Sequence, residues 1–184
     1  MPERSAPATQ GLTESQYQTL QNDILVTNQA EFATAVSAAD YQFISDAYNQ
    51  LAAPVVWCWR TSVSEKELYE ATSPDNTTWS WPALISQTVQ ERDAWSMMMH
   101  PGEINPSLPQ TRDAFTRIFG GTGALPQGQR TFLLSLSRRQ VLRGEALFAD
   151  RTAGDGSTAT PATLVYQGQV TYHDVFYALT GNRP

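Results

Sequence analysis

Prolines and a pair of glycines mark the ends of the periodic segments in this chain. Apolar residues at helical spacing precede Pro54, Pro101 and Gly120-Gly121, and each series stops there. Proline removes a backbone donor and clashes with the preceding turn, whereas glycine accommodates the backbone just past a helix end. The pattern therefore predicts a series of short helices, separated by turns, that extends through residue 149.

Helix start signals fall where these segments begin. Thr13 with Gln16 and Ser64 with Glu67 have the spacing of a capping box, in which the side chains satisfy each other's free backbone donors. Ser37 is the predicted N-cap of the segment that ends at Pro54. Two further starts are predicted, one at Ser80 and Pro82 for a helix that ends at residue 100, and one at Thr171 and Asp174 for a last short helix.

Strand character is confined to two places. Residues 55–61 are β-branched and aromatic, and residues 162–170 alternate loosely after a polar, Gly/Thr-rich linker at 150–161. A single strand cannot satisfy its own backbone groups. We therefore expect 162–170 to pair with another molecule by strand addition, with pairing to residues 55–59 of the same chain as the alternative.

The expected fold is mainly α. It consists of a small helical bundle with a C-terminal extended arm that contains one β-strand and a short helix. The expected boundaries are a flexible N-terminal arm at 1–11, a helical core domain at 12–149, and the linker and C-terminal arm at 150–184.

Charge is unevenly distributed along the chain. The net charge is −6, but residues 1–107 hold four basic residues against thirteen acids, whereas residues 112–151 hold seven basic residues against three acids. Such a division predicts one acidic and one basic surface, or simply solvated helix faces. Only 16% of the residues are charged, which suits a subunit that buries much of its surface against neighbours and also fits an ordinary polar domain.

The lone cysteine, Cys58, excludes an internal disulfide and a cysteine-based zinc site. It stands between two tryptophans, which predicts a small buried apolar residue. No apolar run approaches the roughly 18 residues of a membrane span, and no signal peptide pattern is present. We expect a protein that is assembled in a bacterial host cytoplasm and does not bind a membrane.

Catalytic patterns are weak throughout. His100 and His173 lack a second ligand at metal spacing, and the glycines at 120–123 are not followed by the lysine that a phosphate-binding loop needs. We expect no catalytic, cofactor-binding or metal site, and no enzymatic activity.

Interface residues are predicted instead. Tryptophan, tyrosine and arginine are enriched where proteins bind one another. Residues of the predicted C-terminal arm are candidates because we expect the arm to contact another molecule. The candidates are Trp79, Trp81, Arg138, Arg139, Arg143, Leu164, Tyr166, Val170, Tyr172 and Phe176.

One extended pattern resembles a known family. It runs from Trp59-Arg60-Thr61-Ser62-Val63 through Trp95, Ile104-Asn105-Pro106, Arg112, Phe115, Ile118 and Phe119 to the segment 138–148, and ends with 160–164, Gly168 and Asp174-Val175. Leu20, Ile24 and Thr27 match the family's start, although Asn28-Gln29 replaces its Asp-Pro. The pattern covers about residues 12–178 and resembles the head-to-tail connector proteins of tailed bacteriophages.

The resemblance implies a structural adaptor in the virion neck. Such a protein forms a closed ring of about twelve copies below the portal and joins the DNA-filled head to the tail. The implied partners are other copies of the chain, the portal protein, a downstream neck or tail protein, and genomic DNA that passes through without sequence-specific binding. The alternatives are another neck or tail component, such as a head-closure or tail terminator protein, and a non-virion DNA-binding protein that uses the arginines at 112–151.

Overall fold

The chain folds into two units, and the second is inserted into the sequence of the first. The computed structural model describes residues 11–71, 84–121 and 124–182. Unit 1 holds the residues up to Cys58 and from Gln140 onward, and unit 2 is Trp59–Arg139. The fold is mainly helical, as the sequence predicts. The expected single core at 12–149 is not found, because the middle of that range has a hydrophobic cluster of its own.

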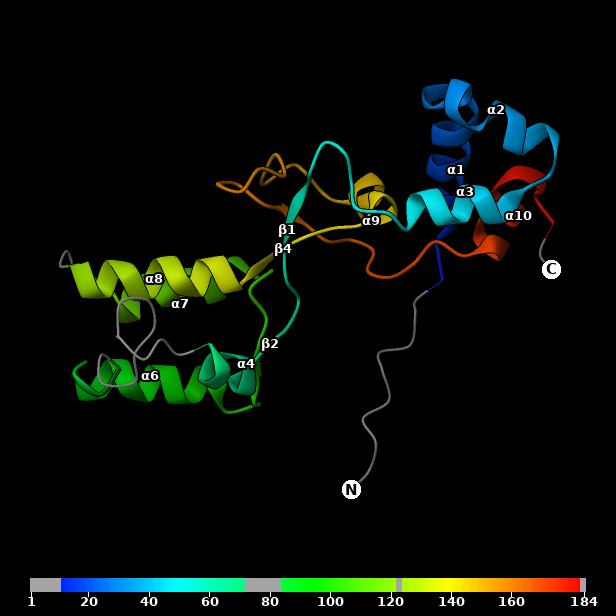
Figure 1. Ribbon diagram of the computed structural model, residues 1–184. Helices are drawn as coiled ribbons and strands as arrows, with labels where there is room; N and C mark the ends of the chain where they lie inside the picture. The colour runs from blue at the N-terminus through cyan, green and yellow to red at the C-terminus, as the bar shows by residue number, and fades with distance from the viewer. Residues whose placement is uncertain (1–10, 72–83, 122–123, 183–184) are drawn as a thin grey trace. The chain divides into compact units, whose positions relative to one another are not determined.

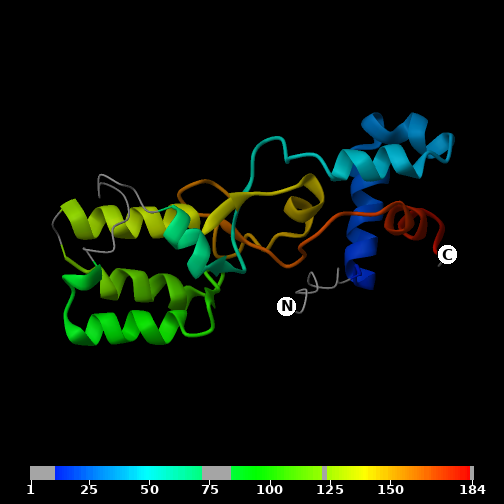
Figure 2. The same ribbon diagram turned by 60° about the horizontal axis from the view of Figure 1, so that its bottom comes forward.

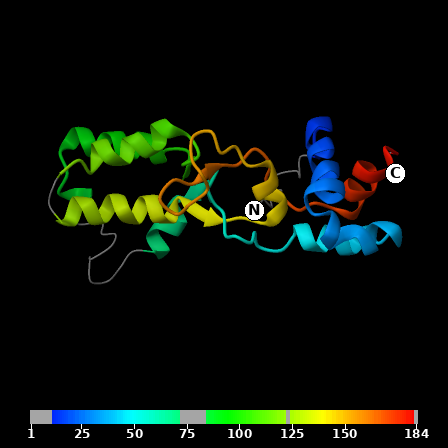
Figure 3. The same cartoon turned by 90° about the horizontal axis from the view of Figure 1, so that it is seen from above.

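Unit 1 is formed by helices from both ends of the sequence (Figure 1). They are α1 (Glu14–Asn22), the π-helix η1 (Asp23–Thr27), α2 (Gln29–Ser37), α3 (Tyr41–Tyr48), α9 (Arg143–Phe148) and α10 (Tyr172–Thr180). The C-terminal helix α10 contacts both α1 and α3, and it lies beside them when unit 1 is seen from above (Figure 3). The two ends of the sequence therefore complete one core.

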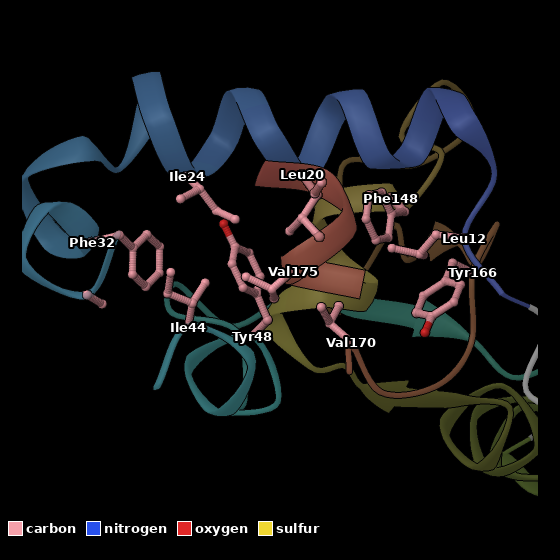
Figure 4. Packing of buried hydrophobic residues seen from close by; sticks show 12 residues of the cluster. Leu12, Leu20, Ile24, Phe32, Ile44, Tyr48, Phe148, Tyr166, Val170 and Val175 are labelled. Carbon is pink, nitrogen blue, oxygen red and sulfur yellow. The ribbon is translucent and has the colours of Figure 1, made fainter. Parts of the chain in front are cut away.

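That core includes the segment expected to be a free arm. Tyr166, Val170 and Val175 are at most 5% exposed, and they pack with residues of α1 and α3. Figure 4 shows them in one cluster with Leu12, Leu20, Ile24, Phe32, Ile44, Tyr48 and Phe148. Residues 164–179 are thus part of unit 1, because their apolar side chains fill the space between α1 and α3.

Side chains from α3 and its C-terminal end hold the backbone of this segment. Asn49 accepts a hydrogen bond from Val170 N at 3.0 Å and donates one to Val170 O at 2.8 Å. Ser45 Oγ also donates to Val170 O, at 2.8 Å. The buried carboxylate of Glu145 accepts from Gly168 N at 3.2 Å. These side chains supply the hydrogen bonds that a strand partner would otherwise provide.

The expected strand at 162–170 is accordingly wrong for most of its length. Only β5 (Ala162–Thr163) is a strand, and it lies in a sheet of order β4-β1-β5 with β4 (Arg138–Gln140) and β1 (Trp57–Trp59). Pairing is thus within the chain and against residues 57–59, which was the alternative to pairing with another molecule. Cys58, in β1, is fully buried, as the sequence predicts.

In its described residues, unit 2 has three longer helices and a two-stranded sheet. Figure 2 shows the helices, coloured green to yellow, alongside one another. Its elements are β2 (Val63–Ser64), α4 (Glu65–Glu70), α6 (Val89–Met99), β3 (Glu103–Ile104), α7 (Pro109–Ile118) and α8 (Ala124–Leu136). Strands β2 and β3 are antiparallel, with Val63 opposite Ile104. A core of Leu68, Trp95, Phe115, Phe119 and Leu133 joins the helices.

Several predicted helix starts are confirmed by their hydrogen bonds. Capping boxes form at Thr13 with Gln16 and at Thr171 with Asp174, and Ser64 and Glu67 bond reciprocally. Two predictions were wrong. Ser37 is the last residue of α2, and Asp40 caps α3 instead. In the described part of the predicted 80–100 helix, α6 begins only at Val89, because Thr88 and Glu91 form a stronger start signal.

Candidate functional site

The predicted interface residues differ in where the structure places them. Trp79 and Trp81 lie outside the described residues. Tyr166 and Val170 are core residues of unit 1, so the expectation that they contact another molecule is corrected by their burial. The half-buried members are Leu164, which packs against the cluster around Cys58, and Arg138 and Arg139 in β4.

Tyr172 is exposed and Phe176 is half-buried, and the fold brings them together with the half-buried Tyr41 of α3. The Tyr41 ring lies edge-on to both, with centroids 5.6 Å from Tyr172 and 5.5 Å from Phe176. Tyr172 and Phe176 are themselves stacked at 6.4 Å, and Tyr172 is 40% exposed. We name these three residues the aromatic surface. Such mutually supported rings lose little side-chain freedom when they bind a partner.

A second surface with exposed apolar side chains lies on α6 of unit 2. Trp95 and Met99, one turn apart, are buried on one side of this helix. Val89 and Met97 are 61% and 78% exposed on the other side. We name Val89 and Met97 the α6 surface. The exposed Asp93 lies between them, because it is four residues from each and residues four apart share one side of a helix. The exposed side of α6 is therefore mixed in character.

Arg143 stands out among the predicted candidates for its ordered surroundings. Its guanidinium forms two parallel hydrogen bonds with Glu31, at 2.6 Å and 2.8 Å. It also lies 5.0 Å from the ring centroids of Phe32 and Tyr48. The hydrogen bond from Arg143 lowers the pKa of Glu31 below its usual value. This bidentate and stacked arrangement is one that lysine could not reproduce.

The π-helix places a second polar group beside this pair. Asp23, its first residue, accepts hydrogen bonds from Tyr48 Oη at 2.6 Å and from Asn28 Nδ2 at 2.9 Å. Burial, and then the hydrogen bond to Asp23, raise the pKa of Tyr48 above its ordinary value. Tyr48 is therefore neutral at physiological pH and acts as a donor to Asp23. Both groups lie in unit 1 and connect α3 to η1.

The sequence did not reveal this network. Glu31 and Arg143 are 112 residues apart, and the insertion of unit 2 separates them. Local patterns carry no signal for such a contact. The only indication in the sequence was the opposite net charge of residues 1–107 and residues 112–151.

The two folded units divide the charged residues differently from the two regions of the sequence, 1–107 and 112–151. The sequence of unit 1 contains four arginines against ten acids, a formal charge of −6, and that of unit 2 contains eight basic residues against eight acids. The expected acidic region at 1–107 and basic region at 112–151 therefore do not correspond to the two folded units.

Within the described ranges, no group of three histidine, cysteine, aspartate or glutamate side chains is placed to hold a metal ion. In the same part of the chain, no helix has the length and apolar character needed to cross a bilayer.

Comparison of the chain with protein-family models, with curated proteins and with solved structures finds no match.

Proposed function

We propose that this chain is a structural head-to-tail adaptor of a tailed phage, forming a ring below the portal that joins the head to the tail. The observation that carries the proposal is that two separate units expose two unlike groups of side chains. One is Tyr172 with its neighbouring rings, and the other is Val89 and Met97 with Asp93 between them. A closed ring requires each subunit to offer two unlike surfaces, one for each neighbour. The sequence pattern that resembles phage connector proteins supports the same assignment.

The two surfaces are chemically suited to each other. The aromatic surface of unit 1 presents tyrosine and phenylalanine rings, and the α6 surface presents the thioether of Met97. Sulfur packs favourably against aromatic rings, and methionine adapts to the shape of a partner. We propose that the aromatic surface of one subunit contacts the α6 surface of the next.

The mainly helical fold supports an adaptor over a head-closure or tail terminator protein, since we expect those to be richer in β-structure. The DNA-binding alternative requires free arginines, and several are engaged within the chain. Arg112 donates to Pro106 O and Ser107 O, Arg130 donates to Phe119 O, and Arg143 binds Glu31. Arg143 is thus neutralised by Glu31. Arg112 and Arg130 instead keep their charge but use N–H donors within the chain that a phosphate group would need.

The test begins with purified virions of the source phage. Quantitative mass spectrometry should give a ratio of this chain to the portal protein near one to one. Absence of the chain from the particle would refute the adaptor role, and salt-dependent binding of the pure protein to duplex DNA would then support the alternative.

Two variants test the contact itself. Met97→Glu and Tyr172→Glu each place a charge on an exposed position, so the subunit should fold while its incorporation into particles falls about ten-fold or more. Gln110→Glu adds the same charge at an exposed position in the first turn of α7 and should be incorporated normally. Equal incorporation of all three variants would exclude the proposed pair of surfaces.

A further inference from the structure

An open groove of about 640 Å³ lies within unit 1. One part of its wall is apolar and comes from Leu51, Ala53, Pro54 and Leu147. The Glu31–Arg143 pair and Asp23 form part of the polar wall. The apolar side chains and the charged groups thus come from different segments of one folded unit.

The backbone at Leu51 offers an unused edge to this groove. Leu51 and Leu142 are opposite each other in an isolated antiparallel bridge. The bonds of this bridge are made by the flanking residues, from Ala52 N to Val141 O and from Arg143 N to Gln50 O. In a pair of this type, the N–H and C=O of the central residues point away from the partner strand. Neither group of Leu51 bonds to another described residue.

The side chain of Leu51, like its backbone groups, is open to contact with another molecule. It is 58% exposed although it belongs to a paired segment and lines the groove. An exposed leucine beside a free backbone donor and acceptor is the arrangement that an added strand uses. Pro54 has no N–H, so such pairing is confined to the residues that precede it.

The charged side chains of the groove indicate which kind of extended segment it would bind. Glu31 is neutralised by Arg143. Asp23 keeps its charge, but its carboxylate already accepts hydrogen bonds from Tyr48 and Asn28. The exposed guanidinium of Arg151 lines the same groove and has no acidic partner among the described residues. An occupant with a carboxylate would supply that partner.

We propose that this groove binds an extended, mostly uncharged peptide segment of a partner protein, which pairs with the backbone of Leu51 and places one carboxylate on Arg151. The apolar wall receives the side chains that alternate with the acid, because alternate residues of an extended chain point to the same side. This binding does not depend on the adaptor role, and it concerns different residues from the aromatic and α6 surfaces.

The test uses the full, ¹⁵N-labelled chain and a capped hexapeptide of alternating valine and threonine, with one threonine replaced by glutamate, as the probe. The same peptide with glutamine in place of glutamate tests the charge, and an N-methylated version tests backbone pairing. The glutamate peptide should shift the amide resonances of Leu51 and its neighbours and the side-chain resonance of Arg151. The N-methylated peptide should bind more weakly than its parent.

Arg151→Gln should weaken binding of the glutamate peptide about two- to five-fold, the usual range for one exposed ion pair, and leave the glutamine peptide unaffected. Arg117→Gln, an exposed arginine of α7 in unit 2, is the matched control and should change neither affinity. The proposal is overturned if the shifts fall outside the groove, if both peptides bind Arg151→Gln and the parent chain alike, or if millimolar peptide causes no shift.

Discussion

Truncation after Ala149 tests whether the C-terminal segment is an arm or part of a core. The deletion removes Tyr166, Val170 and Val175, each at most 5% exposed. Burial of one such side chain contributes about 1.5–3 kcal/mol, so the three together contribute about 5–9 kcal/mol. Because a domain is stable by only about 5–15 kcal/mol in total, unit 1 should unfold.

Hydrogen exchange measured by mass spectrometry reports each unit separately. In the truncated chain, the amides of α1 and α3 should exchange at the rate of an unfolded segment. Unit 2 has its own core, so α7 and α8 should keep their protection and act as an internal control. Retained protection of α1 and α3 would refute the conclusion that residues 164–179 complete the core.

Three single substitutions test individual contacts. Asn49→Ala removes both side-chain bonds to Val170 and should lower the free energy of unfolding, measured in urea, by about 1–3 kcal/mol. The control Gln42→Ala removes an exposed hydrogen bond of α3 and should change this free energy by less than about 0.5 kcal/mol. Equal effects of the two variants would contradict the conclusion that Asn49 holds the backbone of Val170. Gly144→Ala would place a Cβ 2.6 Å from a methyl group of the buried Val170 and should destabilise the chain by about 1–3 kcal/mol in the same assay. Unchanged or raised stability would show that the structure relaxes around this contact without cost. The pKa of Glu31 is lowered in the folded state, so its pairing adds stability above its unfolded pKa near 4.5 and loses it as pH falls through the folded value. Glu31→Gln should therefore flatten the fall of thermal stability on acidification below about pH 4.5, and a fall as steep as that of the parent chain would refute this role.

Local signals in the sequence predicted local structure well. The capping boxes at Thr13 and Thr171 depend on residues three apart, and both form. The helical class follows from the same spacing rules. Contacts across the insertion could not be predicted this way, because Val170 and Asn49 are 121 residues apart in sequence. The alternation at 162–170 suggested a strand, but side chains of unit 1 satisfy that backbone and leave only two residues in a ladder.

The candidate surfaces were predicted only in part. Tyr172 and Phe176 were identified by residue type, since aromatic residues are common in interfaces, and they do lie in the accessible cluster. Tyr166 was chosen by the same rule and is buried against Phe148. Residue type cannot separate these cases, because an aromatic ring stabilises a core as well as an interface. Met97 was not predicted, because its exposure depends on which side of α6 faces the core of unit 2.

The distribution of charge between the units favours one type of assembly over another. Unit 1 carries a formal charge of −6 and unit 2 is neutral, so contact between two copies of unit 1 brings like charges together. Contact of unit 1 with unit 2 of a neighbour avoids this repulsion. In about 0.1 M salt, charges repel one another appreciably only within a distance of roughly 10 Å. A two-fold dimer built on the aromatic surface would pair unit 1 with itself, whereas a head-to-tail ring pairs unlike units throughout. Electrostatics and the two unlike surfaces therefore favour the same arrangement, although they arise from different residues.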